Sequence, residues 1–326
     1  MREEQWPEDP PRGVEETLGN WRYIPRYLDL HQRVAWTSDG SQAVGRASIN
    51  IGRYYQNAHM ADFDIYVLPG FRRRGIGRGL LTAITEVAER EDRSLLLVST
   101  DAAIPAGRAF VLRLEARAGV ESTTSQLEMQ NLNTQLVNEW LQKGRRHAAS
   151  FALGFWESEY PPEYVAEMAE VKHVMNSAPT DNLELEEFGW TVDDLRQEED
   201  SLRRRGIQRW TLHLRHRGSG QIAGFTEVFF HAAHPAILEQ GHTAVVPQFR
   251  NRGLAQWLKG EMLQRIVAQH PEVKIIRTVN ASSNLSMIRI NQRLGFRRYK
   301  SWTTWQIDLG SVLSYLKGQQ SQLTLE

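Results

Sequence analysis

The chain has 326 residues, enough for two domains that each bury a hydrophobic core. Lysine plus arginine and aspartate plus glutamate both number 39, so the formal net charge is zero, which excludes a general electrostatic affinity for nucleic acid or anionic membranes. Without cysteine, disulfides and thiolate sites are excluded. The charged start MREEQWPEDPPRG lacks a signal-peptide core, so we expect a cytoplasmic chain with no membrane span.

The first half of the chain predicts three strands, a helix and a fourth strand. Two apolar-rich segments within residues 31–51 flank the turn residues 38–41 and predict a hairpin. A third alternating segment over 62–68 ends at Pro69, and SLLLVST over 94–100 is typical of a buried strand. Between these two strands, one helical face carries Leu80, Leu81, Ile84, Val87 and Ala88.

The second half repeats this order roughly 180 residues later, a spacing that indicates a duplicated domain rather than a solenoid. A hairpin over 209–230 turns at residues 218–220, and a strand over 241–246 ends at Pro247. A buried strand is expected over 273–279 and a further helix over 284–296. The helix between them carries Leu254, Leu258, Met262 and Ile266 on one face.

The boundary between the copies is expected near Asn133, which gives domains over 1–132 and 133–326. Residues 122–135 are polar with few apolar anchors and predict a linker, while 136–146 predicts a short connecting helix.

The start of the second copy is longer than that of the first. Residues 147–157 predict a strand, and two helices are expected around 162–176 and 192–205. The first copy has only about thirty residues for the same three elements, which is too few at usual element lengths. We therefore expect the first copy to be abbreviated at its start.

Two loops rich in glycine and arginine, FRRRGIGRGLL from Phe71 and FRNRGLAQWLK from Phe249, each open a helix. The first turn of a helix leaves backbone N–H groups unpaired at the positive end of its dipole, where phosphate binds if no side chain obstructs it. Small residues remove the obstruction and arginines add donors that suit phosphate oxygens. These residues are Gly75 and Gly77 with Arg72, Arg73, Arg74 and Arg78, and Gly253 and Ala255 with Arg250 and Arg252.

Either loop would fit a pyrophosphate, but the usual ATP and NAD patterns do not occur. No G-x-x-x-x-G-K-[ST] run is present. Leu80 and Leu258 occupy the third glycine place of G-x-G-x-x-G, and each loop follows a hairpin rather than a βα unit. The histidines show no H-x-x-x-H pair, so no metal site is expected.

The loops resemble the acetyl-coenzyme A signature of the GNAT superfamily of N-acetyltransferases, strand, R-x-x-G-x-G/A, helix. The segment NLSMIRINQRLGF, from Asn284 to Phe296, is similar to the family's last helix, and the duplication resembles the tandem group that includes mycothiol synthase. The resemblance implies two GNAT-like α+β domains, each a mixed, mostly antiparallel sheet flanked by helices, with acetyl-CoA as co-substrate. The residues implied to hold it are Val67, Leu68, Arg72, Arg73, Arg74, Gly75, Ile76, Gly77 and Arg78, and Val245, Val246, Arg250, Asn251, Arg252, Gly253, Leu254, Ala255 and Asn284.

Acetyl transfer to an amine needs a deprotonated amine and a polarised carbonyl. The resemblance implies that backbone N–H groups around Val245 and Val246, or Val67 and Leu68, polarise the carbonyl. It also places a catalytic glutamate at Glu239, with Ala61 at the corresponding place in the first copy.

Further candidates surround Glu239. His242 is one, and Glu227 is another, because burial among apolar neighbours would raise its pKa. The family often supplies a tyrosine acid on the last helix, but that place holds Asn291 here and Glu115 in the first copy, where Arg108 also replaces the family asparagine. We therefore expect catalysis by Glu239, Glu227, His242 and Asn291 in the second copy.

These observations predict an acetyltransferase acting on the primary amine of a small molecule, by direct attack because no cysteine can relay the acyl group. Two alternatives remain open: a non-catalytic acyl-CoA-binding regulatory module, and an acetyltransferase for protein amines. The acidic stretch 175–190 could attract a cationic amine. Trp302 and Trp305 would face opposite sides of a regular strand, where burial at a domain contact is favoured over stacking on a ligand.

Overall fold

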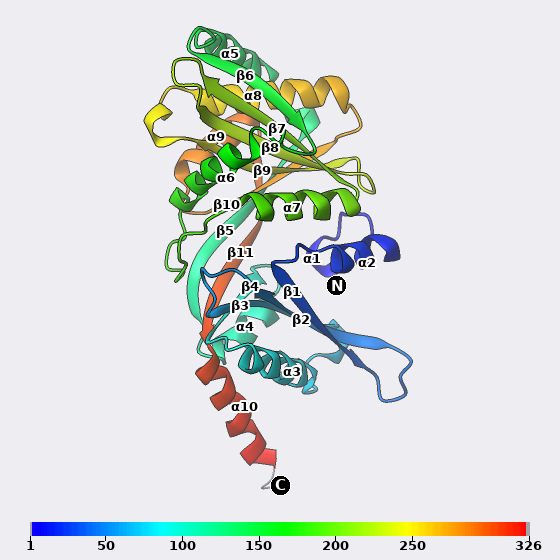
Figure 1. The fold of residues 1–326 in the computed structure, drawn as a ribbon. Coiled ribbons are helices and arrows are strands. Elements are labelled where there is room, and N and C mark those ends of the chain that lie inside the picture. Colours follow the sequence, from blue (N-terminus) through cyan, green and yellow to red (C-terminus); the bar gives the residue numbers. More distant parts are fainter. Residues whose placement is uncertain (1, 324–326) are drawn as a thin grey trace.

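One continuous sheet of eleven strands runs through the whole protein, in the order β1-β2-β3-β4-β11-β5-β10-β9-β8-β7-β6. In the computed structural model, which describes residues 2–323, two long strands at its centre join the two halves (Figure 1). The strands are β1 Leu28–Trp36, β2 Ala43–Gly52, β3 Met60–Val67, β4 Leu95–Asp101, β5 Arg117–Glu128, β6 Phe151–Glu157, β7 Ile207–His216, β8 Ile222–His231, β9 Ile237–Val245, β10 Ile275–Ala281 and β11 Arg297–Asp308.

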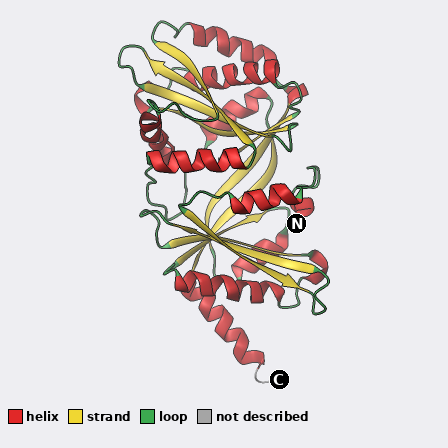
Figure 2. Cartoon of the chain, turned by 45° about the vertical axis from the view of Figure 1, so that its right-hand side comes forward, coloured by secondary structure: helices red, strands yellow, loops and turns green. Residues whose placement is uncertain are grey.

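Helices cover both faces of this sheet (Figure 2). Their bounds are α1 Arg2–Gln5, α2 Val14–Arg22, α3 Ile76–Arg90, α4 Pro105–Leu112, α5 Thr134–Arg145, α6 Val165–Lys172, α7 Val192–Arg204, α8 Leu254–Gln269, α9 Leu285–Leu294 and α10 Leu309–Leu323, with short 3-10 turns η1 Pro69–Phe71, η2 Met129–Asn131, η3 His173–Ser177 and η4 Pro247–Phe249. Both expected hairpins, the strands before the loops and the helices after them are confirmed.

The strand β8 shows how the second half is layered. Val228 packs in the core under α8 and α5, whereas Phe225 packs with Met168 of α6 and Leu195 of α7. Alternate residues of a strand point to opposite faces, so α8 and α6–α7 lie on opposite sides of the same strands. In the first half, α3 covers one face with Leu81, Ile84 and the rest of its predicted apolar stripe buried.

The expected linker over 122–135 is wrong. Residues 117–128 form β5, which pairs with β10 on one side and β11 on the other, while β11 in turn pairs with β4. Each copy thus places its last strand beside the other copy. Leu127 packs in the core of the second half, and Trp305 and Ile307 pack in that of the first. The polar composition of β5 concealed it, because only three of its twelve residues are buried.

The division at 132/133 falls between β5 and α5 and stays a prediction, since the sheet and both cores cross it. Trp305 is buried and donates through Nε1 to Thr100 Oγ1, while Trp302 donates to Thr124 Oγ1 and lies 6.0 Å from the Trp6 ring. One indole therefore lies in the core of the first half and the other against the N-terminal segment.

From residue 2 onward, the first copy begins with two short helices and has no counterpart of β6, so β1 is one of the two edge strands of the sheet, as expected for an abbreviated copy. Part of its sheet face is covered instead by residues 178–190 of the second copy. Leu183 packs against Met60, Leu95 and Leu97, and Glu184 pairs with Arg117 at 2.7 Å.

Asn57 and Glu186 extend the same contact through reciprocal backbone and side-chain hydrogen bonds. The carboxylates of Glu184 and Glu186 are thus engaged in joining the copies. These two glutamates therefore have a structural role. The attraction of a cationic amine by the acidic stretch 175–190 stays a prediction.

The last helices of the copies align four residues differently from the sequence expectation. Glu115 has φ of 58° after α4 and corresponds to Gly295, with φ of 110°, after α9. The backbone N–H of the next residue makes the equivalent bond in both copies, Ala116 to Val111 O matching Phe296 to Asn291 O. Val111, not Glu115, therefore occupies the place of Asn291, and Ile104, not Arg108, occupies the place of Asn284 as helix N-cap.

Candidate functional site

The two glycine loops have the same backbone conformation. Arg73 and Asn251 have φ of 63° and 62°, and Gly75 and Gly253 have φ of 82° and 77° at the N-caps of α3 and α8. Little would obstruct a Cβ at either glycine. Glycine is favoured at both positions because the left-handed backbone conformation strains any other residue. The repeated sequence thus encodes a repeated loop.

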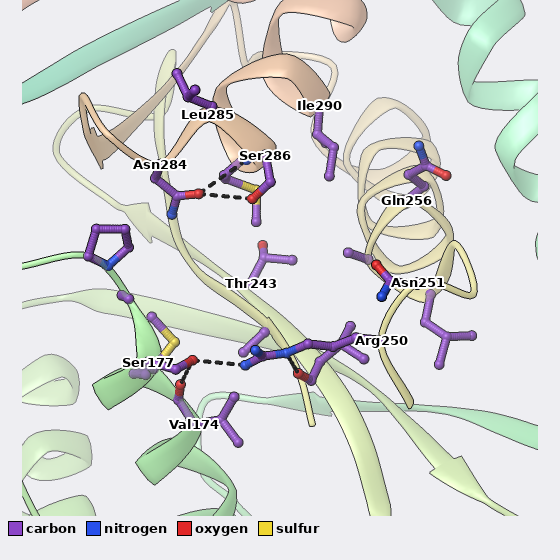
Figure 3. A pocket seen from close by; sticks show the side chains of 18 of the residues that line it. Val174, Ser177, Thr243, Arg250, Asn251, Gln256, Asn284, Leu285, Ser286 and Ile290 are labelled. Atoms are coloured by element: carbon purple, nitrogen blue, oxygen red, sulfur yellow. Dashed lines mark hydrogen bonds between the residues drawn. The ribbon is translucent and has the colours of Figure 1, made fainter. Parts of the chain in front are cut away.

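A cavity of about 760 Å³ is bordered by the second loop (Figure 3). Asn284 and Ser286 at the start of α9 face Arg250 and Asn251 across it, with Thr243 of β9 between them. The predicted cofactor residues that line this cavity are Val245, Arg250, Asn251, Gly253, Leu254, Ala255 and Asn284; Val246 and Arg252 do not line it.

The donors around this cavity fit a phosphate-bearing ligand. The start of α8 has no side-chain cap, so its first backbone N–H groups remain for a ligand anion. Asn284 caps α9 through Oδ1, which accepts from Met287 N at 3.3 Å. A helix start without a cap, beside a cavity of this size, is consistent with the pyrophosphate and pantetheine of coenzyme A.

The leading arginine of each loop turns back onto its own strand. Arg250 donates from Nε to Val245 O at 3.0 Å and from Nη2 to Ser177 Oγ at 2.8 Å. Arg72 donates from Nε to Val67 O at 3.0 Å and pairs with Glu4 at 2.6 Å. These guanidinium groups hold the loops in shape.

The other predicted residues of the first loop lie on α3 and its approach. Arg73 and Arg74 are exposed, and Arg78 and Ile76 are half-buried. A Cβ at Gly77 would meet only Phe110 and Val67, both beyond 3.7 Å in ordinary contact. The first loop therefore presents its arginines to the surface.

Only part of the predicted carbonyl-polarising backbone is free. Val246 N donates to Ala223 O and Leu68 N donates to Val44 O, both at 2.9 Å, so neither can serve. Hydrogen-bonded and non-bonded pairs alternate along an antiparallel ladder, which turns the N–H groups of Val245 and Val67 away from their hairpin partners. These two groups face the gap beyond β9 and beyond β3.

This gap exists because the parallel pairing of β9 with β10, and of β3 with β4, ends before the C-terminal half of β9 and β3. β9 pairs with β10 only from Ile237 to Glu239, whose partner is Arg277, and β3 pairs with β4 only from Met60 to Asp62. Glu239 thus corresponds to Asp62, and the expected match with Ala61 is wrong. The offset of one residue arises from a bulge in β9 between Gln240 and Thr243 that β3 lacks. Glu239 is exposed and does not line the cavity.

Glu227 is completely buried on the α6–α7 side of β8. It accepts a hydrogen bond from the Tyr160 hydroxyl, and Lys172 Nζ and His242 Nδ1 lie 3.4 and 3.7 Å from its Oε2. Burial alone would raise its pKa, but Lys172, Arg209 and His242 outweigh burial and lower the pKa to about 2. The expectation of a raised pKa is therefore wrong, because the sequence did not reveal the buried cations.

Two members of this cluster were missed from sequence. Lys172 has a 2% exposed side chain, and Tyr160 lies under the guanidinium of Arg209, whose Cζ is 3.7 Å from the ring centroid. Glu198 and Glu199 bind Arg209 at 3.2 and 2.7 Å. Since these residues come from α6, α7, β7 and the segment between β6 and α6, no local pattern could have grouped them.

Asn291 does not reach the cavity. It is 1% exposed, and its Nδ2 donates to Asn280 Oδ1 at 3.0 Å. The predicted catalytic residues thus do not form one cluster. His242 and Glu227 lie together, Glu239 lies nearer the start of β9, and Asn291 packs against Asn280 of β10.

Comparison with known proteins agrees with this architecture. A sequence model described as "Acetyltransferase (GNAT) family" matches residues 1–110. Mycothiol acetyltransferase of Mycobacterium leprae is 26% identical over 258 residues, which cover 77% of this chain and 76% of the relative. The solved tandem GNAT protein from the clavulanic acid biosynthesis pathway aligns with a TM-score of 0.74 and 26% identity over 93% of this chain and 91% of that one. By these matches the chain is similar to GNAT-family acetyltransferases that carry two domains in tandem.

A further solved structure supports this fold. The GCN5-related N-acetyltransferase from Sphaerobacter thermophilus aligns with a TM-score of 0.66 over 94% of this chain and 89% of its own, at 16% identity. Within residues 2–323, none of the helices combines the length and apolar character needed to cross a membrane.

Proposed function

We propose that this protein transfers an acetyl group from acetyl-CoA to the primary amine of a small molecule, in its second copy. The observation that carries the proposal is the cavity of about 760 Å³, which joins the uncapped start of α8 to Thr243, the neighbour of His242. A site for the phosphate end of a coenzyme thus continues toward a strand that carries ionisable side chains.

The first copy is proposed to bind acetyl-CoA without turnover or to act as a scaffold. One face of its sheet is partly covered by Leu183, and Glu4 forms an ion pair with the guanidinium of Arg72. Val111 and Ile104 stand where the second copy has Asn291 and Asn284. These differences remove polar groups that the second copy retains.

Direct attack of the amine is proposed, since the chain has no cysteine for a covalent relay. An alkylammonium has a pKa of about 10.4, so a base is needed at neutral pH; Glu239, Glu227 and His242 are the candidates. The N–H of Val245 is proposed to polarise the acetyl carbonyl. With Asn291 turned away, the sulfur would leave without a side-chain acid, which a thiol with a pKa of about 8.5 tolerates.

The names of two relatives favour a small acceptor over a protein amine. One is a mycothiol acetyltransferase and the other belongs to the clavulanic acid biosynthesis pathway, and both names refer to small molecules. The competing function, a regulatory module that binds acyl-CoA without catalysis, would make both copies binding sites only.

Calorimetric titration of acetyl-CoA into the wild type, Gly253→Glu and Gly75→Glu tests the proposal. Each variant places a carboxylate at one helix start, where it repels phosphate. We expect Gly253→Glu to remove binding at the second loop and acetylation of an amine panel, while Gly75→Glu retains acetylation. Binding without turnover of any amine would support the regulatory module, and no binding to the wild type would refute both functions.

A further inference from the structure

The bulge in β9 directs His242 toward the buried carboxylate of Glu227. Gly241 and His242 together occupy the place that Asp64 alone fills in β3, and Ser48 stands at the place of Glu227. His242 Nδ1 lies 3.7 Å from Glu227 Oε2, and its side chain remains 45% exposed. The second copy thus has an imidazole–carboxylate pair that the first copy lacks.

Glu227 is buried and contacted by three polar side chains. The Tyr160 hydroxyl binds Oε1, Lys172 Nζ approaches Oε2, and Gln240 Nε2 donates to the backbone oxygen of the same residue at 2.6 Å. Burial and the charge of Glu227 raise the pKa of Tyr160 well above its usual value, so its hydroxyl stays a donor. A fixed, ionised carboxylate orients the imidazole that it contacts.

We propose that His242 accepts the proton of the acceptor ammonium, and that Glu227, Lys172 and Tyr160 position its imidazole. This inference rests on the proposed function. Neither His242 nor Glu239 lines the cavity, but His242 is the immediate neighbour of Thr243, which does, whereas Glu239 stands four residues before Thr243 at the last rung of the parallel ladder. His242 is the catalytic residue in this scheme, and the other three are positioning residues.

The ammonium loses one proton to Nε2 of His242, and the freed nitrogen lone pair forms the C–N bond. The C–S bond breaks with its electron pair remaining on sulfur. The second proton leaves nitrogen as the amide forms and ends on the sulfur, while His242 returns its proton to water. No oxidant or further reactant is needed.

The charges facing His242 come from three elements: Glu227 of β8, Lys172 of α6 and Glu198 of α7. Partial burial lowers the pKa of His242 and Lys172 lowers it further, while Glu227 and Glu198 oppose them. The imidazole is therefore neutral at pH 7 and able to accept a proton. Removing one neighbour should move its titration in a direction that depends on the sign of the charge removed.

The test is the pH dependence of kcat/KM for a panel amine that the wild type acetylates. His242→Gln should lower kcat/KM at pH 7 by about a hundredfold, the usual contribution of a general base. Glu227→Gln should move the acidic limb of the profile to lower pH, and Lys172→Met should move it to higher pH. His270→Gln changes a histidine that contacts Glu272 rather than Glu227, and it should leave the profile unchanged.

Opposite shifts would not arise from a purely structural role, because unfolding or misplacement lowers activity at every pH. If the buried variants do not fold, an NMR titration of His242, assigned by its loss in His242→Gln, must give the pKa of the acidic limb in the wild type. A mismatch, unchanged activity in His242→Gln, or shifts in the same direction would overturn the proposal. Absence of turnover with every amine in the wild type would instead refute the proposed function.

Discussion

Arg72 and Arg250 lie 178 positions apart and make the same bond: each donates from Nε to the carbonyl oxygen five residues earlier, Val67 O or Val245 O, at 3.0 Å. Their terminal nitrogens then differ in partner, Glu4 for Arg72 and Ser177 for Arg250. A guanidinium on its own strand end fixes where the chain turns into the loop. The duplicated arginine thus has a structural role in each loop.

Arg250→Met should weaken acetyl-CoA binding at the second loop by roughly tenfold, because losing hydrogen bonds from a charged donor costs about 1.4 kcal/mol or more. Calorimetry measures the change. Arg72→Met is the matched control and should leave the affinity of the second site unaltered. Equal affinities in Arg250→Met and the wild type would show that the loop holds its shape without this bond.

Leu183→Ala should lower the free energy of unfolding by about 2 kcal/mol, since Leu183 fills a space between Met60, Leu95 and Leu97 that alanine would leave empty. Denaturant unfolding gives this value. Leu185→Ala, two residues further and 42% exposed, should change it by less than about 0.5 kcal/mol. The same small loss in both variants would mean that Leu183 does not tie the second copy to the first.

His213 should make stability depend on pH. Its ring stacks on Trp156 with centroids 3.8 Å apart, and its Nδ1 has no hydrogen-bond partner among residues 2–323. Burial together with Arg215 lowers the pKa of His213 to about 4 from a usual 6.5. The pKa of His213 is lower in the folded protein than in the unfolded chain. As pH falls, the unfolded chain therefore binds the proton first. Stability is complete above pH 6.5 and falls between pH 6.5 and 4, by up to about 3 kcal/mol.

His213→Phe keeps the stack on Trp156 and removes the titrating group. Thermal unfolding at several pH values should therefore show a shallower loss between pH 6.5 and 4 for this variant than for the wild type. Parallel curves for the two proteins would indicate that another group causes the acid sensitivity.

Local patterns predicted most elements, and the failures share a cause. The stripe of Leu80, Leu81 and Ile84 and the turn at Gly40 were readable because each depends on residues close in sequence. The strand 117–128 was not readable, since its partners lie more than 100 residues away in β10 and β11. The helix alignment failed at Glu115 because a glutamate adopts the left-handed position that glycine usually marks.

The candidate site divides in the same way. The loops around Gly75 and Gly253 were predictable, because a left-handed N-cap before a helix has a sequence signature. The environment of Glu227 was not, because Lys172 and Tyr160 approach it from a different part of the chain and reverse the effect of burial on its pKa.

By itself, the sequence determined a duplicated domain, its hairpins, and two helix starts preceded by glycine, since short-range spacing encodes these features. Only the tertiary structure decided that β5 and β11 run between the copies, that a bulge turns His242 toward Glu227, and that Leu183 covers the face of the first copy. Pairing between distant strands and contacts between buried charges depend on which segments meet in space, and no local pattern records that.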